Sequence, residues 1–255
     1  MRNLFHIVCF DLKKRSRDGF IIGYNIIFPI VMTVLLGYLS SESYGKDFTG
    51  YQYYMIVILS FSVAMAVITA AYAGKDDAYK KTAVRYLFSP VSRSQIVLAK
   101  LISCTLVISC CNLLVILFSH LVFKLPLNIK IIPVTLILAA ETFTVCAIGL
   151  FIGLGMKNFI FIKNVLNIPI CLAAILAGTF FPLGTLNDRL EMLIKLSPLT
   201  WVNRSIFLML YDDSSQLLWK TSLIFMITGI GFAILAIKLF KKEEFIHGDL
   251  PGYEK

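Results

Sequence analysis

The class of fold follows from one run of residues, YQYYMIVILSFSVAMAVITAAYA, which extends from Tyr51 to Ala73 and contains no Asp, Glu, Lys, Arg or His. The hydrocarbon core of a bilayer is roughly 30 Å thick, and a helix needs about 20 apolar residues to cross it. Lipid cannot hydrogen-bond to backbone groups, and the run does not alternate as a barrel strand would. The run therefore predicts a transmembrane helix.

Apolar runs of this kind recur along the chain. With the first, they cover residues 20–40, 51–73, 96–123, 131–155, 165–181 and 217–240. The whole sequence is 58% hydrophobic and 15% charged, whereas soluble domains are roughly 45–50% apolar and about 25% charged. This composition excludes a water-soluble enzyme. We predict an all-α integral membrane protein with six transmembrane helices in a single domain, residues 1–255.

The distribution of basic residues predicts the topology. Seventeen of the 24 Lys and Arg residues fall on the side that holds both termini and the connections between spans 2 and 3 and between spans 4 and 5. Basic residues concentrate on the cytoplasmic side of membrane proteins. We therefore expect a multi-pass protein of the plasma membrane with both termini in the cytoplasm and an uncleaved first span.

The segment before the first span, residues 2–18, has the pattern of an interfacial helix. Leu4, Val8 and Leu12 recur every four residues, and a basic cluster follows them. The apolar side chains would sink into the acyl boundary while the cations meet anionic lipid. The alternative is a basic tail without regular structure.

The connection between spans 2 and 3 is longer than a tight turn requires. It predicts a cytoplasmic helix from Asp76 to Ser89 that Pro90 ends, with Asp77 and Lys81 spaced for an i,i+4 ion pair. Ser92 is placed to cap the third span. The alternative is a solvated loop whose charges only determine orientation.

The connection between spans 5 and 6, from Pro182 to Gln216, is too apolar for a free loop. Pro198 divides it into two pieces with helical spacing, and neither piece is long enough to span the membrane. Two short helices that enter the outer leaflet and return, a re-entrant pair, account for this pattern. The alternative is a lid in the interface with no gating role.

Polar groups within the predicted spans are candidates for the transport path. An ionised carboxylate near the bilayer centre costs about 2.5–3.5 kcal/mol on insertion scales, so Glu141 is expected to face the bundle. Glu141 and Asn112 could line a translocation path, or each could make a structural hydrogen bond between helices. Gly149, Gly153 and Gly155 predict close packing of helices.

The sequence contains no pattern that predicts a nucleotide-binding, metal-binding or catalytic site. Neither Gly45-Lys46 nor Gly74-Lys75 has the flanking residues of a phosphate-binding loop. The six cysteines form no readable disulfide or metal pattern. An intramembrane enzyme would need a nucleophile and a base in neighbouring spans, which Glu141 and the distant His120 do not supply.

Two motifs carry a resemblance to a known family. They are SPVSRSQIVLAK, Ser89 to Lys100, and LIKLSPLTWVNRSIFLML, Leu193 to Leu210. Together with the order of segments along the whole chain, they make the protein similar to the permease subunit of ABC-2 type exporters, the type V ABC exporters. The resemblance implies that the helix after span 2 is a coupling helix, which docks on a separate ATP-binding subunit.

The resemblance also implies residues and partners. By position, the coupling contacts would be Tyr79, Lys80, Lys81, Arg85, Tyr86 and Leu87. The re-entrant gate would include Leu186, Leu190, Pro198 and Trp201. ATP and Mg²⁺ would be bound by two copies of the ATP-binding subunit, and a second permease chain, identical or similar, would complete the transporter.

These observations predict a function in export. Apolar walls with few charges favour an amphipathic cargo, such as a drug, a peptide antibiotic or a lipid. We expect a bacterial membrane subunit without its own ATP site and without nucleic acid as a partner. The alternatives are an ABC-type membrane subunit used for antibiotic sensing or resistance without bulk transport, and an intramembrane enzyme.

Overall fold

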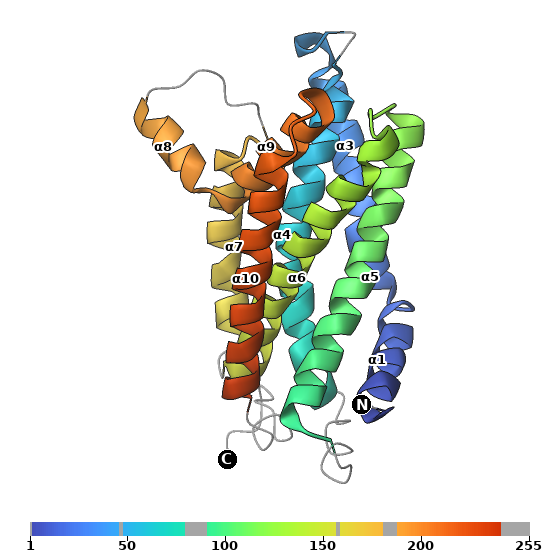
Figure 1. Ribbon diagram of the computed structural model, residues 1–255, viewed down its shortest axis with the longest axis vertical. Helices are drawn as coiled ribbons and strands as arrows, with labels where there is room; N and C mark the ends of the chain where they lie inside the picture. The colour runs from blue at the N-terminus through green and yellow to red at the C-terminus, as the bar shows by residue number, and fades with distance from the viewer. Residues whose placement is uncertain (1, 46–47, 80–90, 157–158, 181–187, 241–255) are drawn as a thin grey trace.

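The computed structural model describes residues 2–45, 48–79, 91–156, 159–180 and 188–240, and the regular elements within these ranges are helical. The long helices run side by side as a bundle (Figure 1). In chain order the elements are α1 (Arg2–Arg15), α2 (Gly19–Ile22), η1 (Gly23–Ile27), α3 (Phe28–Leu39), η2 (Ser41–Ser43), α4 (Gly50–Tyr79), α5 (Arg93–Val122), η4 (Asn128–Lys130), α6 (Ile131–Gly155), α7 (Phe159–Leu176), α8 (Asp188–Leu196), α9 (Pro198–Tyr211) and α10 (Gln216–Leu239). We call the end near α1 the lower end and the end near α8 and α9 the upper end.

Five helical segments of the described chain are long and apolar enough to cross a bilayer. They are Gly19–Leu39, Gly50–Asp77, Arg93–Val122, Ile131–Gly155 and Gln216–Leu239. The remaining predicted span, residues 165–181, corresponds to α7, whose apolar helical part Asn164–Leu176 is shorter. The integral membrane, all-α class is therefore confirmed. The count of six spans stays a prediction, although α7 returns the chain from the lower to the upper end (Figure 1).

The helix ends meet where the predicted connections require, but α4 runs without a break to Tyr79, so the prediction of a separate helix that begins at Asp76 is wrong at that end. α1 and the last turn of α10 lie at the same lower end, and α4 ends there where α5 begins (Figure 1). Ser92 caps α5 as predicted, because its hydroxyl accepts a hydrogen bond from Gln95 N–H while the Gln95 side chain accepts one from Ser92 N–H. Which side of the membrane the lower end faces stays a prediction.

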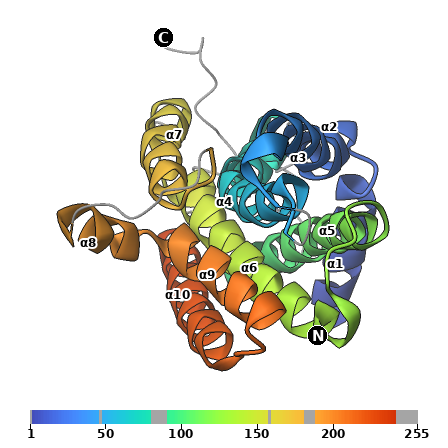
Figure 2. The same ribbon diagram turned by 90° about the horizontal axis from the view of Figure 1, so that it is seen from above.

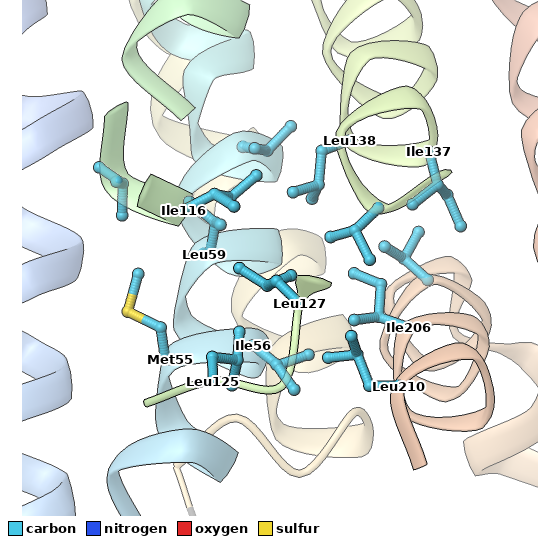
Figure 3. Packing of buried hydrophobic residues seen from close by; sticks show 14 of the residues in the cluster. Met55, Ile56, Leu59, Ile116, Leu125, Leu127, Ile137, Leu138, Ile206 and Leu210 are labelled. Carbon is cyan, nitrogen blue, oxygen red and sulfur yellow. The ribbon is translucent and has the colours of Figure 1, made fainter. Parts of the chain in front are cut away.

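A continuous apolar core fills the upper half of the bundle (Figure 3). Leu59 of α4, Ile116 of α5 and Leu138 of α6 contribute to it, and Ile206 and Leu210 enter it from α9. The chain therefore breaks into two short helices at Pro198, as predicted, but α9 packs into the bundle instead of lying over it. Whether the pair forms a gate or a lid without a gating role stays a prediction.

In the lower half, α4 and α6 approach closely because small residues face each other. A Cβ atom on Gly149 would lie 2.5 Å from the Val67 carbonyl oxygen, and one on Gly153 would meet the carbonyl oxygen of Ala71. A Cβ on Gly155 would make an ordinary contact with Leu239 at 3.5 Å. The predicted close packing is confirmed for the first two glycines and is wrong for Gly155.

The orientation of α1 corrects one prediction. Val8 is buried and Leu12 packs near Val107 of α5, so this face meets protein and not lipid. Phe5 and Phe10 are instead 67% and 62% exposed. The physical reason is that the inward face also carries charged residues, described below, which need protein partners. The phenylalanines are left as the apolar groups available to the membrane interface.

Candidate transport cavity and ionic cluster

Glu141 lies near the middle of α6 and is 1% exposed. The hydroxyl of Ser60 on α4 lies 3.3 and 3.4 Å from the two carboxyl oxygens and donates a hydrogen bond to the group. Ser60 and Glu141 are each about two helical turns from the glycine contact described above, so close packing of α4 and α6 brings them within reach. The prediction that Glu141 faces the bundle is confirmed.

Glu141 also lines a cavity of about 510 Å³. Five helices form the walls, α4, α6, α7, α9 and α10. The lining residues are Ala64, Val67, Glu141, Thr144, Val145, Ile148, Leu166, Pro169, Ile170, Ala173, Pro198, Leu199, Trp201, Ile224, Phe225, Thr228 and Phe232. Among them, Glu141 is the only residue with an ionisable side chain. The structure thus brings together three residues singled out separately in the sequence, Glu141, Pro198 and Trp201.

Asn112 does not line this cavity. It is 2% exposed, and its amide nitrogen donates to the Thr142 hydroxyl at 3.2 Å, between α5 and α6. Thr142 follows Glu141 in the sequence and so points to another side of α6. Asn112 is therefore placed as a link between helices, which was the alternative to a place on the transport path.

One hydrogen bond attaches the α8–α9 pair to a carbonyl group in the last turn of α7, and another joins the two short helices. Ser197 donates to the Ala173 carbonyl at 2.9 Å. Trp201 Nε1 donates to the Lys195 carbonyl at 2.7 Å and so joins α9 to α8. Of the other predicted gate residues, Leu186 and the side chain of Leu190 lie outside the described residues.

An ionic cluster at the lower end joins α1 to α4 and α5. Lys100 of α5, 1% exposed, donates to Asp77 at 2.5 Å and to the Ala73 carbonyl at 2.9 Å, both on α4. Lys14 of α1 pairs with Asp76 and lies 3.2 Å from Asp77. These bonds attach α1 to α4, and α4 to α5.

Buried groups of α1 complete this ionic cluster. Arg15 Nε donates to Ser103 of α5 at 3.1 Å, and Asp11 is 2% exposed with Oδ2 lacking a hydrogen-bond partner among the described residues. Burial raises the pKa of the Asp11 carboxyl above 3.8. This effect outweighs the positive charges of Lys100 and Arg15, which lower the pKa. Burial alone would lower the pKa of Lys14, but its bonds to the Asp76 and Asp77 carboxylates raise it.

Sequence reasoning missed the ionic cluster. Asp77 was expected to pair with Lys81, which lies outside the described residues, and Lys100 was named only as the end of the motif that resembles the family. The usable signal was the position of Lys100 inside a predicted span, because a charge there needs a partner. Tyr79 is the last residue of α4, although its side chain is not described, and the other predicted coupling residues, Lys80, Lys81, Arg85, Tyr86 and Leu87, lie outside the described residues.

Together these features define an α-helical integral membrane protein with an apolar cavity that five helices line. The family model described as ABC-2 type transporter matches residues 2–211. The chain therefore belongs to the ABC-2 type transporter family and is a multi-pass permease component of an ABC transporter. Membership implies association with an ABC ATP-binding subunit, in which ATP is hydrolysed. No curated protein matches the sequence.

Proposed function

We propose that this chain is the membrane subunit of an ATP-driven exporter that moves an amphipathic substrate out of a bacterial cell. The cavity around Glu141 carries this proposal. Its walls are almost entirely apolar, and its volume of about 510 Å³ lies within the roughly 300–1,000 Å³ that small-molecule sites occupy. Such a site suits a molecule with a large apolar part better than a sugar or a small ion.

The proposal also includes the orientation of the chain in the membrane. The excess of basic residues supports placing the lower end, with α1 and the beginning of α5, in the cytoplasm. Two ATP-binding subunits would then act on the segment between α4 and α5, in a transporter of two identical or two similar permease chains. The ionic cluster would transmit movement of that segment to α1 and α5 together, because Asp77 bonds to both helices.

Reconstitution tests the proposed function. The chain, purified with its ATP-binding subunit, is placed in vesicles whose proposed cytoplasmic side faces outward, and uptake of a fluorescent amphipathic drug or a fluorescent lipid is followed after ATP addition. We expect ATP-dependent accumulation, which Arg85→Asp and Tyr86→Asp abolish. Lys220→Asp, at the upper end of α10, is the control and should transport normally.

Two results would change the assignment. Normal transport by both the Arg85 and Tyr86 variants would show that the coupling helix is wrongly placed. ATP hydrolysis that amphiphiles stimulate, without any movement of them, would favour the alternative function in sensing or resistance without bulk transport.

A further inference from the structure

The Glu141 carboxyl group has no cationic partner among the described residues that line its cavity. The Ser60 hydroxyl donates a hydrogen bond to the carboxyl group, and no Lys, Arg or His is among the described residues that line the site. The other polar lining groups are used by the protein itself: Thr144 donates to the Phe225 carbonyl at 2.5 Å, and Thr228 donates to the Ile224 carbonyl at 2.9 Å. A ligand that carries a positive charge would therefore supply a cationic partner for the Glu141 carboxyl group.

Aromatic side chains line the same cavity. Trp201 belongs to α9, and Phe225 and Phe232 belong to α10. The faces of aromatic rings attract organic cations, with tryptophan the strongest, and the attraction increases when water is excluded. A buried carboxyl group and aromatic rings in one apolar cavity form the chemical environment that recognises an alkylammonium group.

The cavity is open on the side of the bundle. Figure 2 shows α7 and α10 on either side of α6, and the exposed lining residues lie on α7, α9 and α10. They are Pro169, Pro198, Trp201, Ile224 and Thr228. Because α10 is long and apolar enough to cross the membrane and α7 is a predicted span, a molecule dissolved in the lipid could enter between them without passing through water.

We propose that the cavity around Glu141 binds a small cationic amphiphile, an organic ammonium with a hydrocarbon or aromatic body, which enters from the lipid between α7 and α10. The ammonium group pairs with the Glu141 carboxylate, and its apolar part lies against Ile148, Ile170 and Phe232. This inference rests on the proposed function and narrows its substrate class, because a cavity of about 510 Å³ holds a small molecule but not an entire peptide antibiotic.

Binding is measured on the full chain in phosphatidylcholine nanodiscs, without ATP, so that the result does not depend on transport. The protein has two tryptophans. Trp219 is 53% exposed on α10 and does not line the cavity, so Trp219→Phe leaves Trp201 as the single reporter inside it. The probes are dodecyltrimethylammonium, its neutral counterpart 1-dodecanol and the anion dodecyl sulfate.

We expect a saturable change of Trp201 emission with the cation, at a concentration at least tenfold below that needed for 1-dodecanol or dodecyl sulfate. Glu141→Gln keeps the size of the side chain and an acceptor for Ser60, and should weaken binding of the cation at least tenfold without affecting 1-dodecanol. Ala173→Phe, which fills the cavity, should abolish the response to all three probes. Asp213→Asn, which removes an exposed carboxylate at the upper end, is the control and should bind the cation normally.

The outcomes separate this inference from the proposed function. Equal binding of all three probes, or a Glu141→Gln variant that binds the cation as tightly as the wild type, would overturn the cationic site and leave export of another amphiphile open. Cation binding that depends on Glu141, together with no ATP-driven movement in vesicles, would support the site and contradict export.

Discussion

The difference in burial between the two lysines that bind Asp77 leads to a quantitative prediction. Lys100 is 1% exposed and bonds to Asp77 and to the Ala73 carbonyl, whereas the Lys14 side chain is 28% exposed. Removing one partner of a buried ion pair costs about 3–5 kcal/mol, and a pair near the surface contributes about 1 kcal/mol or less. Since Asp77 keeps Lys14, we expect Lys100→Met to cost about 3 kcal/mol and Lys14→Met about 1 kcal/mol or less.

The assay is thermal denaturation of the purified chain in one detergent, followed by size-exclusion chromatography after heating. For a chain of this length 1 kcal/mol shifts Tm by roughly 2–4 °C, so Lys100→Met should lower Tm by about 6–12 °C and Lys14→Met by less than about 4 °C. Replacing both members of the buried pair, Lys100→Met with Asp77→Leu, should restore part of the loss, because no charge is then left without its closest partner. Equal losses for the two lysine variants, or a double variant less stable than Lys100→Met, would refute the reasoning.

Three further predictions concern packing, burial and a hydrogen bond. Gly153→Leu should lower Tm and yield because the new side chain meets the α4 backbone, while Gly155→Leu should change little; similar losses for both would contradict the assigned α4–α6 contact. Asp11→Asn should leave Tm unchanged near about pH 4 and raise it near about pH 7.5. The reason is that a carboxyl whose folded pKa is raised contributes its stability at low pH and loses it as pH rises through that pKa; a Tm difference independent of pH would rule this out. Tyr53→Phe should cost about 1 kcal/mol, measured as the same Tm shift, because the Tyr53 hydroxyl donates to the Gly178 carbonyl at 2.9 Å and so joins α4 to the turn after α7; no shift would show that this bond is not stabilising.

Patterns formed by residues close in sequence predicted local structure correctly. Ser92 with Gln95 and the break at Pro198 were correctly interpreted, because capping and helix termination depend on residues close in sequence. The face of α1 was assigned wrongly, because Leu4, Val8 and Leu12 have the spacing of a buried face whether they meet lipid or protein. Only the packing of α5 against α1 distinguishes the two.

The candidate site was predictable from the sequence only in part. Glu141 could be selected from the sequence because a carboxyl group within an apolar run requires an interior position. Its neighbours Pro198 and Trp201 could not be selected in this way, since they belong to α9 and are far from Glu141 along the chain. Asn112, which looked equivalent to Glu141, lies on the side of α6 that meets α5.

The sequence by itself determined that this is an α-helical membrane protein, because the length and charge of each run have to match the bilayer, whose thickness and lack of hydrogen-bonding groups are known in advance. The tertiary structure alone decided which faces meet. The pairing of Lys100 with Asp77, the burial of Asp11, and the cavity shared by Glu141, Pro198 and Trp201 each depend on how separate helices pack. Periodicity shows that a helix has a polar or apolar face, but the identity of the side chains opposite that face exists only once the bundle has formed.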